Sequence, residues 1–245
     1  MKASYIENVN VQQTEGLSGQ VHGQAHTVQS IVGEAMKPQT TSFSNGIGNN
    51  NNARFSIFGY GYRNKQGQAV LQTKPAGVTD ILSVYQYITS PAAKAAQDTL
   101  RAMRGKTDKA ECSDYKKLNF RFVTFRGIFA ERKASSLSLL SDYMVVDIDE
   151  LSSAEEARRL IRLLSDDTHF ETALAFVSPG GMGVKWVVEI PNWLQEMSYK
   201  EQYLFACRHV MLQYGVEPDW GCSDVCRACF LGHDKDCFIN PKFIM

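Results

Sequence analysis

The sequence lacks any apolar run near the roughly 20 residues that a membrane-spanning helix needs. Its N-terminal stretch, MKASYIENVNVQQ, has no continuous apolar segment, so we expect no secretory signal. The six cysteines then predict reduced thiols in a cytoplasmic protein, not a disulfide framework. A Walker A pattern, GxxxxGK[ST], is also absent. These absences argue against a membrane protein, a disulfide-rich secreted protein and a P-loop nucleotide site.

Charge is absent only on average, because 26 basic and 26 acidic residues cancel. Residues 1–53 carry a net charge of −1, residues 54–140 carry +9, and residues 141–245 carry −8. A basic region beside an acidic one favours a polyanion-binding flank next to a metal-binding core. A mixture of solvated faces is the alternative explanation.

Residues 1–53 are rich in Gln, Ser, Thr, Asn and Gly, and we expect this low-complexity region to be disordered. Residues 54–245 are expected to form one domain, with a basic N-terminal part over 54–140 and a metal-binding core over 141–245. In the basic part the pattern predicts a strand in RFSIFGYGYRN, helices in GVTDILSVYQYITS and AAKAAQDTLRAMRG, a charged loop over 106–117, and a strand in LNFRFVTFRGIF.

From residue 142 onward, strands and helices are expected in regular alternation. Strands are predicted in DYMVVDID, TALAFVS, VKWVVEI and RACFLG, and helices in SSAEEARRLIRLLS and SYKEQYLFACRHVMLQYG. The order β-α-β-β-α-β is that of the ferredoxin-like, or split βαβ, arrangement, in which strands one and three are adjacent at the sheet centre. The sequence therefore predicts an α+β fold, with helices on one face of a sheet and an N-terminal α/β extension.

The first of these strands ends in two aspartates, Asp147 and Asp149, within YMVVDIDEL. Strand side chains alternate between faces, so both carboxylates project to the same side, roughly 7 Å apart. Like charges this close repel unless a positive charge lies between them, and a divalent cation is the obvious candidate. A simple strand-end turn is the alternative, but the apolar residues 143–146 place the two acids at the mouth of a core strand.

The segment SPGGMGVKW lies where the hairpin between strands two and three is expected. Its glycines would leave backbone N–H groups open to an anion, Ser178 supplies a hydroxyl, and Lys185 supplies a compact positive charge suited to phosphate. Because strands one and three would be neighbours, Lys185 is expected near Asp147 and Asp149. A plain turn is the alternative, but together these groups indicate a nucleotide site.

The segment GVEPDWGCSDVCRACFLGHDKD offers further charged residues. Asp219 is expected to complete a three-carboxylate metal site, with Asp224 and Asp234 as rivals. Arg227 is expected either to contact a nucleotide phosphate or to hold an acid in place. A surface loop is the alternative explanation.

The same segment contains Cys222, Cys226 and Cys229 in a CxxxCxxC spacing. This spacing matches the radical-SAM cluster motif, but that chemistry needs a barrel after the motif, and only 16 residues follow Cys229. A zinc site at these cysteines stays open as an alternative, although their spacing fits no regular finger. No partners are apparent for four of the five histidines: His22, His26, His169 and His209.

Taken in order, four segments resemble a known family: KLNFRFVTFRGIFAER, YMVVDIDEL, AFVSPGGMGVKWVV and GVEPDWGCSDVCRACFLGHD, the last followed by NP. They are similar to the N-terminal domain of virulence-associated protein E-like proteins of Bacteroidetes-type mobile elements. Those proteins look like members of the archaeo-eukaryotic primase (primase-polymerase) superfamily. The resemblance covers roughly residues 54–243 and implies an RRM-like catalytic core.

The resemblance also implies the roles of particular residues. It assigns catalysis and metal binding, by Mg²⁺ or Mn²⁺, to Asp147, Asp149 and Asp219. It assigns nucleotide contacts to residues of the second motif and its surroundings: Ser178, Gly181, Gly183, Lys185 and Arg227. There are two departures, since many members carry His where Lys185 stands, and Gly180 stands where a second small hydroxyl residue is expected.

The leading hypothesis is a DNA primase/polymerase-like nucleotidyltransferase of mobile-element replication, which transfers nucleotides onto a 3′-hydroxyl. Its expected partners are a single-stranded DNA template, held by Arg126, Arg132 and Lys133, and nucleoside triphosphates. Relatives commonly continue into a helicase-like ATPase module, so a helicase partner is expected as a separate chain. The alternative is a catalytically inactive single-stranded DNA-binding protein on the same fold. A haloacid dehalogenase-type phosphatase is disfavoured, because Glu150 and Leu151 follow the second aspartate.

Overall fold

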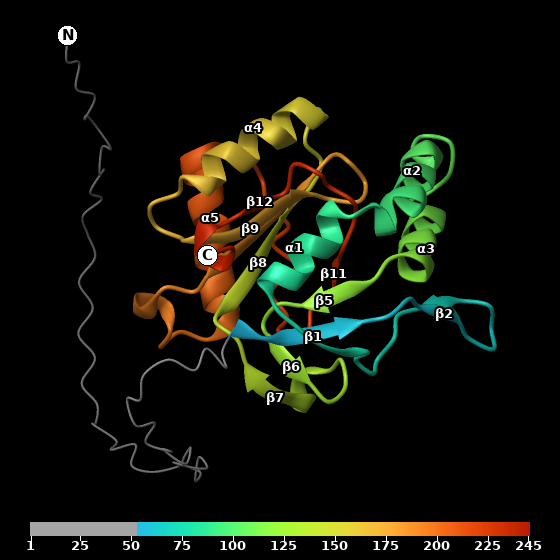
Figure 1. Ribbon diagram of the computed structural model, residues 1–245, viewed down its shortest axis with the longest axis horizontal. Helices are drawn as coiled ribbons and strands as arrows, with labels where there is room; N and C mark the ends of the chain where they lie inside the picture. The colour runs from blue at the N-terminus through green and yellow to red at the C-terminus, as the bar shows by residue number, and fades with distance from the viewer. Residues whose placement is uncertain (1–52) are drawn as a thin grey trace, which may run out of the picture. The chain divides into compact units, whose positions relative to one another are not determined.

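The computed structural model describes residues 53–245, which fall within one compact unit (Figure 1). The low-complexity region predicted over 1–53 therefore lies outside the described residues, apart from Ala53. The described chain is α+β, as the sequence predicts, and it has five α-helices and antiparallel strand pairs. Within it, no helix combines the length and apolar character that crossing a membrane requires.

The C-terminal sheet has the strand order β12-β9-β10-β8. β8 and β10 pair along six residues, which places Lys185 directly opposite Asp147. β10 also pairs with β9, and there Lys185 lies opposite Phe176. The four strands are β8 (Tyr143–Ile148), β9 (Thr172–Val177), β10 (Val184–Glu189) and β12 (Phe238–Ile239).

One face of this sheet is covered by α4 (Ala154–Ser165) and α5 (Tyr199–Tyr214). α4 begins where the Ser153 hydroxyl accepts the Glu156 N–H at 3.1 Å. α5 begins with a capping box formed by Ser198 and Glu201. α5 ends at Gly215, whose φ of 67° suits glycine. Both helices bury their apolar side against the sheet, around the fully buried Trp186.

The opposite face packs against α1 (Ile81–Thr89) and a second sheet (Figure 1). α1 buries Ile81, Val84 and Ile88, which recur at helical spacing. The second sheet has the order β11-β5-β1-β4. Its strands are β1 (Phe55–Phe58), β4 (Gly77–Thr79), β5 (Phe122–Thr124) and β11 (Cys229–Phe230). Asp147 projects from the same face of β8 as Tyr143 and Val145, which pack on this side. It therefore lies between the C-terminal sheet and the second sheet.

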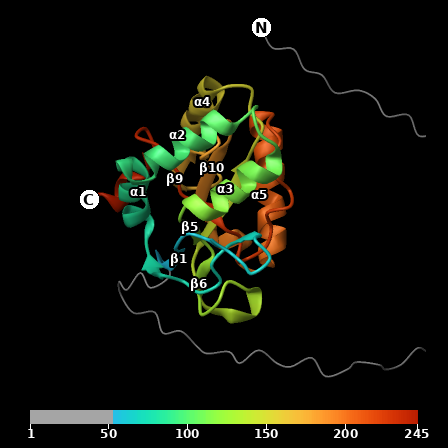
Figure 2. The ribbon, with the colours of Figure 1, turned by 90° about the vertical axis from the view of Figure 1, so that its right-hand side faces the viewer.

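The remaining elements are short or peripheral. α2 (Lys94–Met103) and α3 (Lys109–Asn119) lie side by side beyond the sheets (Figure 2). Two small hairpins are formed by β2 (Tyr62–Arg63) with β3 (Ala69–Val70), and by β6 (Gly127–Phe129) with β7 (Leu137–Leu140). Short 3₁₀ turns are η2 (Pro91–Ala93), η3 (Ala134–Ser136), η4 (Asn192–Leu194) and η5 (Pro241–Phe243).

Two predictions for the basic part are wrong. The expected loop over 106–117 is mostly helix α3, which begins where Asp108 accepts the Glu111 N–H at 2.6 Å. None of its residues is fully buried, so the apolar periodicity that reveals a helix is weak. The single strand expected in LNFRFVTFRGIF is the end of α3 followed by β5 and β6, which belong to different sheets. Glycine is required where β6 begins, because a Cβ at position 127 would meet the Leu139 carbonyl oxygen at 2.2 Å.

The predicted fourth strand of the C-terminal sheet is also wrong. RACFLG contributes β11, which pairs with β5 in the second sheet. The edge position beside β9 is taken by β12 instead. Strands β8 and β10 are neighbours as predicted, but β8 lies at the edge of the hydrogen-bonded order, not at its centre. A run of only two strand residues carries no information about which of two sheets it will join.

Candidate metal and nucleotide site

The loop after α5 is tied to the end of β8, and this brings two predicted acids together. The Asp219 N–H donates to the Asp147 carbonyl oxygen at 2.8 Å. The Tyr203 hydroxyl, from α5, donates to the Asp219 carbonyl oxygen at 2.6 Å. As a result, carboxylate oxygens of Asp147 and Asp219 and the Cys222 sulfur lie within 4.8 Å of one another. Such a group offers the ligands of a metal site at the strand end.

Asp149 follows β8 and is exposed. Its carboxylate lies over Gly183, where an added Cβ would stand 2.6 Å from Asp149 Oδ1. Glycine at position 183 therefore makes room for this acid. An open pocket of about 600 Å³ adjoins it, with Asp149, Glu150, Glu217 and Asp219 among its lining residues. Asp149 and Asp219 thus border the same open space.

Lys185 forms an ion pair with Asp147, as the strand register dictates. The two side chains are only 11% and 17% exposed, respectively. Burial opposes the charge on Lys185, but Asp147 and Asp149 outweigh it and raise the pKa of this lysine. Burial raises the pKa of Asp147, with a contribution from Asp149 and opposition from Lys185. The predicted phosphate-binding lysine thus also serves as the counter-ion of the buried acid.

Asp219 is held by its own loop. The Cys222 thiol donates to Asp219 Oδ2 at 3.0 Å, and the Gly221 N–H donates to Oδ1 at 2.8 Å. The hydrogen bond from Cys222, with help from Gly221 and Arg227, holds the pKa of Asp219 below its usual range. Arg227 Nη2 stands 3.6 Å from Asp219 Oδ2, and Nη1 stands 3.8 Å from Asp224 Oδ2. Of its two predicted roles, Arg227 is placed to hold an acid.

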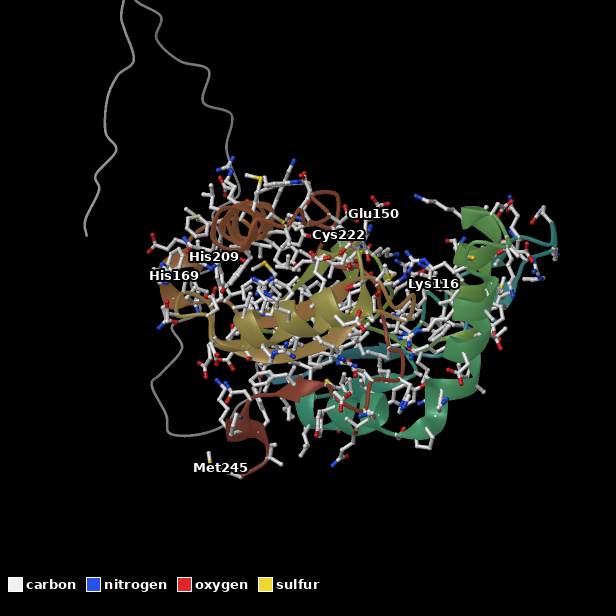
Figure 3. The ribbon with its side chains drawn as sticks, turned by 90° about the horizontal axis from the view of Figure 1, so that it is seen from above. Lys116, Glu150, His169, His209, Cys222 and Met245 are labelled. Carbon is white, nitrogen blue, oxygen red and sulfur yellow. The ribbon has the colours of Figure 1, made fainter. Side chains whose placement is uncertain are left out.

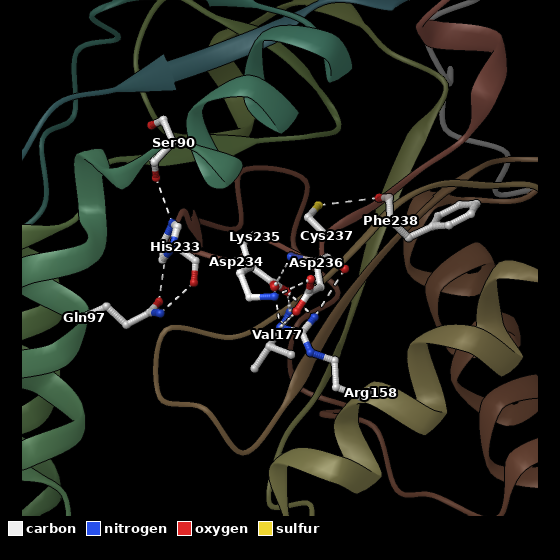
Figure 4. Close-up of polar contacts among 10 residues, drawn as sticks. All are labelled: Ser90, Gln97, Arg158, Val177, His233, Asp234, Lys235, Asp236, Cys237 and Phe238. Atoms are coloured by element: carbon white, nitrogen blue, oxygen red, sulfur yellow. Dashed lines mark hydrogen bonds and ion pairs between the residues drawn. The ribbon is translucent and has the colours of Figure 1, made fainter.

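The two rival acids lie elsewhere. Asp224 pairs with Arg227 and is not in the group formed by Asp147, Asp219 and Cys222. Asp234 is buried and is bound by Arg158 of α4, while its Oδ2 accepts the Val177 N–H at 2.8 Å (Figure 4). Its hydrogen bonds join separate elements, which indicates a structural role.

Three basic residues missed by the sequence analysis border the site. Arg101 Nε donates to the Pro179 carbonyl oxygen at 3.2 Å, and Arg104 Nη1 donates to that of Gly180 at 2.6 Å. Lys116, on α3, lies across from Cys222 and Glu150 (Figure 3). Burial and then the nearby charge of Lys185 lower the pKa of Lys116. All three residues lie in the basic region over 54–140, which was the signal in the sequence. Because residues 106–117 were predicted to be a loop, the sequence did not indicate that α3 brings Lys116 to the site.

The Gly-rich hairpin is more internally bonded than predicted. The Ser178 N–H donates to the Gly183 carbonyl oxygen at 2.8 Å, and the Gly181 N–H donates to that of Ser178 at 2.9 Å. The expectation that Gly181 offers a free N–H to an anion is therefore wrong, because a tight turn uses this group. Ser178 itself is buried, at 7% exposure.

The residues proposed for template binding have protein partners. Arg126 donates to the Ser141 carbonyl oxygen at 2.6 Å and lies over the Tyr199 ring at 5.2 Å. Arg132 lies 5.9 Å from the centre of the Phe122 ring. Lys133 pairs with Glu131 at 2.7 Å and is half-exposed. Arg126 is thus a packed residue, while Lys133 keeps access to solvent.

The cysteine alternative finds no supporting cluster in residues 53–245. Cys229 is buried in β11, Cys226 donates to Asp224 at 3.4 Å, and Cys222 belongs with Asp147 and Asp219. His22 and His26 lie outside the described residues. His169 and His209, for which no partner is apparent in the sequence, are close to Asp167.

A comparison with protein families decides the membership of the chain. The model of the BT4734-like, N-terminal domain family matches residues 115–238, just over half of the 245 residues. The chain belongs to the BT4734-like N-terminal domain family. The BT4734-like match includes Asp147, Lys185 and Asp219, and it begins within α3 and ends in β12. The chain matches no curated protein and no solved structure.

Proposed function

We propose that this chain is a metal-dependent nucleotidyltransferase of the primase-polymerase type, allied to the virulence-associated protein E-like domains of mobile elements. The observation that carries the proposal is the meeting of the Asp147 and Asp219 carboxylates at the mouth of β8, beside Lys185. Acids on one side and the basic residues Lys185 and Lys116 on the other suit a metal-bound triphosphate.

The fold supports the same proposal. The succession β8-α4-β9-β10-α5 and the neighbouring order β8-β10-β9 are those of the first three strands of an RRM-like core. The fourth strand departs from it, because β12 pairs with β9. We therefore regard the core as an RRM-like variant with a relocated edge strand.

The donor set fits Mg²⁺ or Mn²⁺. These hard cations prefer carboxylate oxygens, which Asp147 and Asp219 supply and to which the exposed Asp149 can add. Burial raises the pKa of the Cys222 thiol, so this sulfur stays protonated and is a poor ligand for such ions. Bound metal would supply activation of the primer 3′-hydroxyl and neutralisation of the leaving pyrophosphate.

The residues of the chain have distinct tasks in this proposal. Asp147, Asp149 and Asp219 hold the metal, and Arg227 keeps Asp219 in position. Lys185, which pairs with Asp147 in this structure, would contact the phosphates together with Lys116. Arg101 and Arg104 fix the hairpin that contains Ser178, Gly181 and Gly183.

Primer extension tests the proposal. Purified protein is incubated with primed and unprimed single-stranded DNA, labelled nucleotides, and Mg²⁺ or Mn²⁺. Asp147→Asn should reduce extension by more than about 100-fold, since even outer partners of metal ligands are worth about 10–100-fold. Asp224→Asn is the matched control and should retain activity, because Asp224 lies outside the metal group. Full extension by Asp147→Asn would refute the assignment.

A second candidate is an inactive single-stranded DNA-binding protein on the same fold. The observation in its favour is that both acids already have cationic partners, Lys185 and Arg227. It predicts DNA binding that weakens steeply with salt and is equal in wild type and Asp147→Asn, with no extension product in either. A helicase is the further partner that the family resemblance implies for either candidate.

A further inference from the structure

A second group of metal-ligating side chains lies in the part of the chain that the structure describes. Ligand atoms of Asp167, His169 and His209 are within 4.8 Å of one another. The group is at the far end of the C-terminal sheet from Asp147. β9 starts at Thr172, which is level with Val188, whereas the end of β8 at Ile148 pairs with Val184. Figure 3 shows His169 and His209 together, well away from Cys222 and Lys116.

Asp167 is held rigidly in the loop between α4 and β9. Its Oδ1 accepts the N–H groups of His169 and Phe170, each at 2.8 Å. Its Oδ2 faces His209 Nε2 at 2.6 Å and accepts the Tyr214 hydroxyl. Burial opposes the charge, but these hydrogen bonds outweigh it and lower the pKa of Asp167. The carboxylate is therefore fixed in place by groups from the loop and from α5.

The two imidazoles reach the carboxylate from different elements. His209 extends from α5, with its side chain 7% exposed, and its ring lies 5.3 Å from that of Phe170. His169 is exposed in the loop, and its ring centre is 4.9 Å from that of His209. One ligand is thus fixed in the core, one is fixed by the loop backbone, and the third closes the group from the solvent side.

We propose that Asp167, His169 and His209 form a Zn²⁺ site with three protein ligands and a fourth position open to solvent. Two imidazoles and one carboxylate are a donor set that suits zinc. Zinc–ligand bonds of about 2.0–2.2 Å place tetrahedral ligand atoms roughly 3–3.5 Å apart, so the short contact between Asp167 and His209 must open by less than about 1 Å. The hydrogen bond from Tyr214 then orients the ligating carboxylate from outside the site.

The site would connect the loop after α4 to α5, and it is independent of the proposed nucleotidyl transfer. The histidines are 40 positions apart in the sequence, which is why their spacing matches no zinc motif. The donor chemistry also separates the two sites, because an oxygen-rich group prefers Mg²⁺ or Mn²⁺ and a nitrogen-containing group prefers Zn²⁺.

Zinc titration of the EDTA-stripped full chain, by calorimetry, tests this proposal. Cobalt absorption reports on tetrahedral geometry at the same site. The informative variant is His169→Gln, because His169 is exposed and is not part of the bond between His209 and Asp167, so folding should be preserved. Circular dichroism checks that it is. Asp147→Asn/Cys222→Ser removes the other metal group, and His22→Gln/His26→Gln removes the N-terminal histidines.

We expect zinc to bind the wild-type chain and to raise its Tm, as any ligand of the native state does. His169→Gln should bind at least tenfold more weakly and lose the Tm increase, while both control variants should match wild type. The proposal is overturned if zinc does not bind, if His169→Gln binds as tightly as wild type, or if affinity falls in a control variant instead.

Discussion

At the scale of single residues, the main feature of the candidate site is the largely buried ion pair between Asp147 and Lys185. Burying a charged group is costly, and removing its partner leaves that cost uncompensated. The β8–β10 register keeps this pair together, since residues directly opposite in the ladder share a face. In the proposed function, the same register places the lysine beside the anion that a cation on the acid would bring.

Lys185→Met should destabilise the protein by about 2 kcal/mol, because it leaves a largely buried carboxylate without its counter-ion. Met keeps the unbranched shape of the lysine side chain, so lost packing contributes little. Urea unfolding followed by circular dichroism measures the change. The double variant Asp147→Leu/Lys185→Met should recover most of the loss, since it removes both charges. A double variant as unstable as the sum of the two single variants would show that the pair does not act as a unit.

At the scale of elements, the sequence predicts best where apolar periodicity is strong. β8, α4, β9, β10 and α5 are found close to their expected positions, since each buries a full face or stripe. α3 was missed because it is half-exposed, and β11 was placed in the wrong sheet because two residues cannot specify a partner. Proximity of Asp147 to Lys185 follows from pairing rules, whereas the approach of Lys116 depends on α3 and was not predictable.

Arg104, the residue that follows α2, provides an element-scale prediction. Arg104→Ala removes the hydrogen bond to the Gly180 carbonyl oxygen, so the hairpin over 178–183 should open more often. Amide exchange within that hairpin should accelerate, including at Gly181, whose N–H is bonded inside the turn. Hydrogen-exchange mass spectrometry makes the comparison.

Lys94→Ala is the matched control, because Lys94 is at the other end of α2 and pairs with Asp98 on the surface. Both variants should stay within about 1 kcal/mol of wild-type stability, since both side chains are exposed or partly exposed. Equal exchange in the Arg104 and Lys94 variants would mean that the hairpin is rigid on its own.

At the scale of the whole molecule, one C-terminal segment connects both sheets. β11 belongs to the sheet of β1, β12 belongs to the sheet of β8, and only residues 231–237 lie between them. His233 in this connection is bound by Gln97 of α2. The Gln97 side chain donates to the His233 carbonyl oxygen at 2.6 Å and accepts the His233 N–H at 2.9 Å (Figure 4). The Asp234 N–H donates to the Ile88 carbonyl oxygen at 2.9 Å. The connection between the two sheets is therefore also fastened to α1 and α2.

Asp234 is the decisive residue of this connection. Its side chain is 1% exposed and joins Arg158 of α4 to the N–H of Val177 at the end of β9. Asp234→Ala should cost about 3 kcal/mol, because it leaves a guanidinium and a buried N–H without their acceptor. Asp236→Ala is the matched control, since Asp236 is exposed and 3.9 Å from the same arginine, and should cost less than about 1 kcal/mol.

If the connection makes the two layers one cooperative unit, wild type unfolds in urea with coincident fluorescence and circular-dichroism transitions, and Asp234→Ala shifts both together. Transitions that separate in wild type would show instead that the layers fold independently and that the site between them is not fixed by this segment.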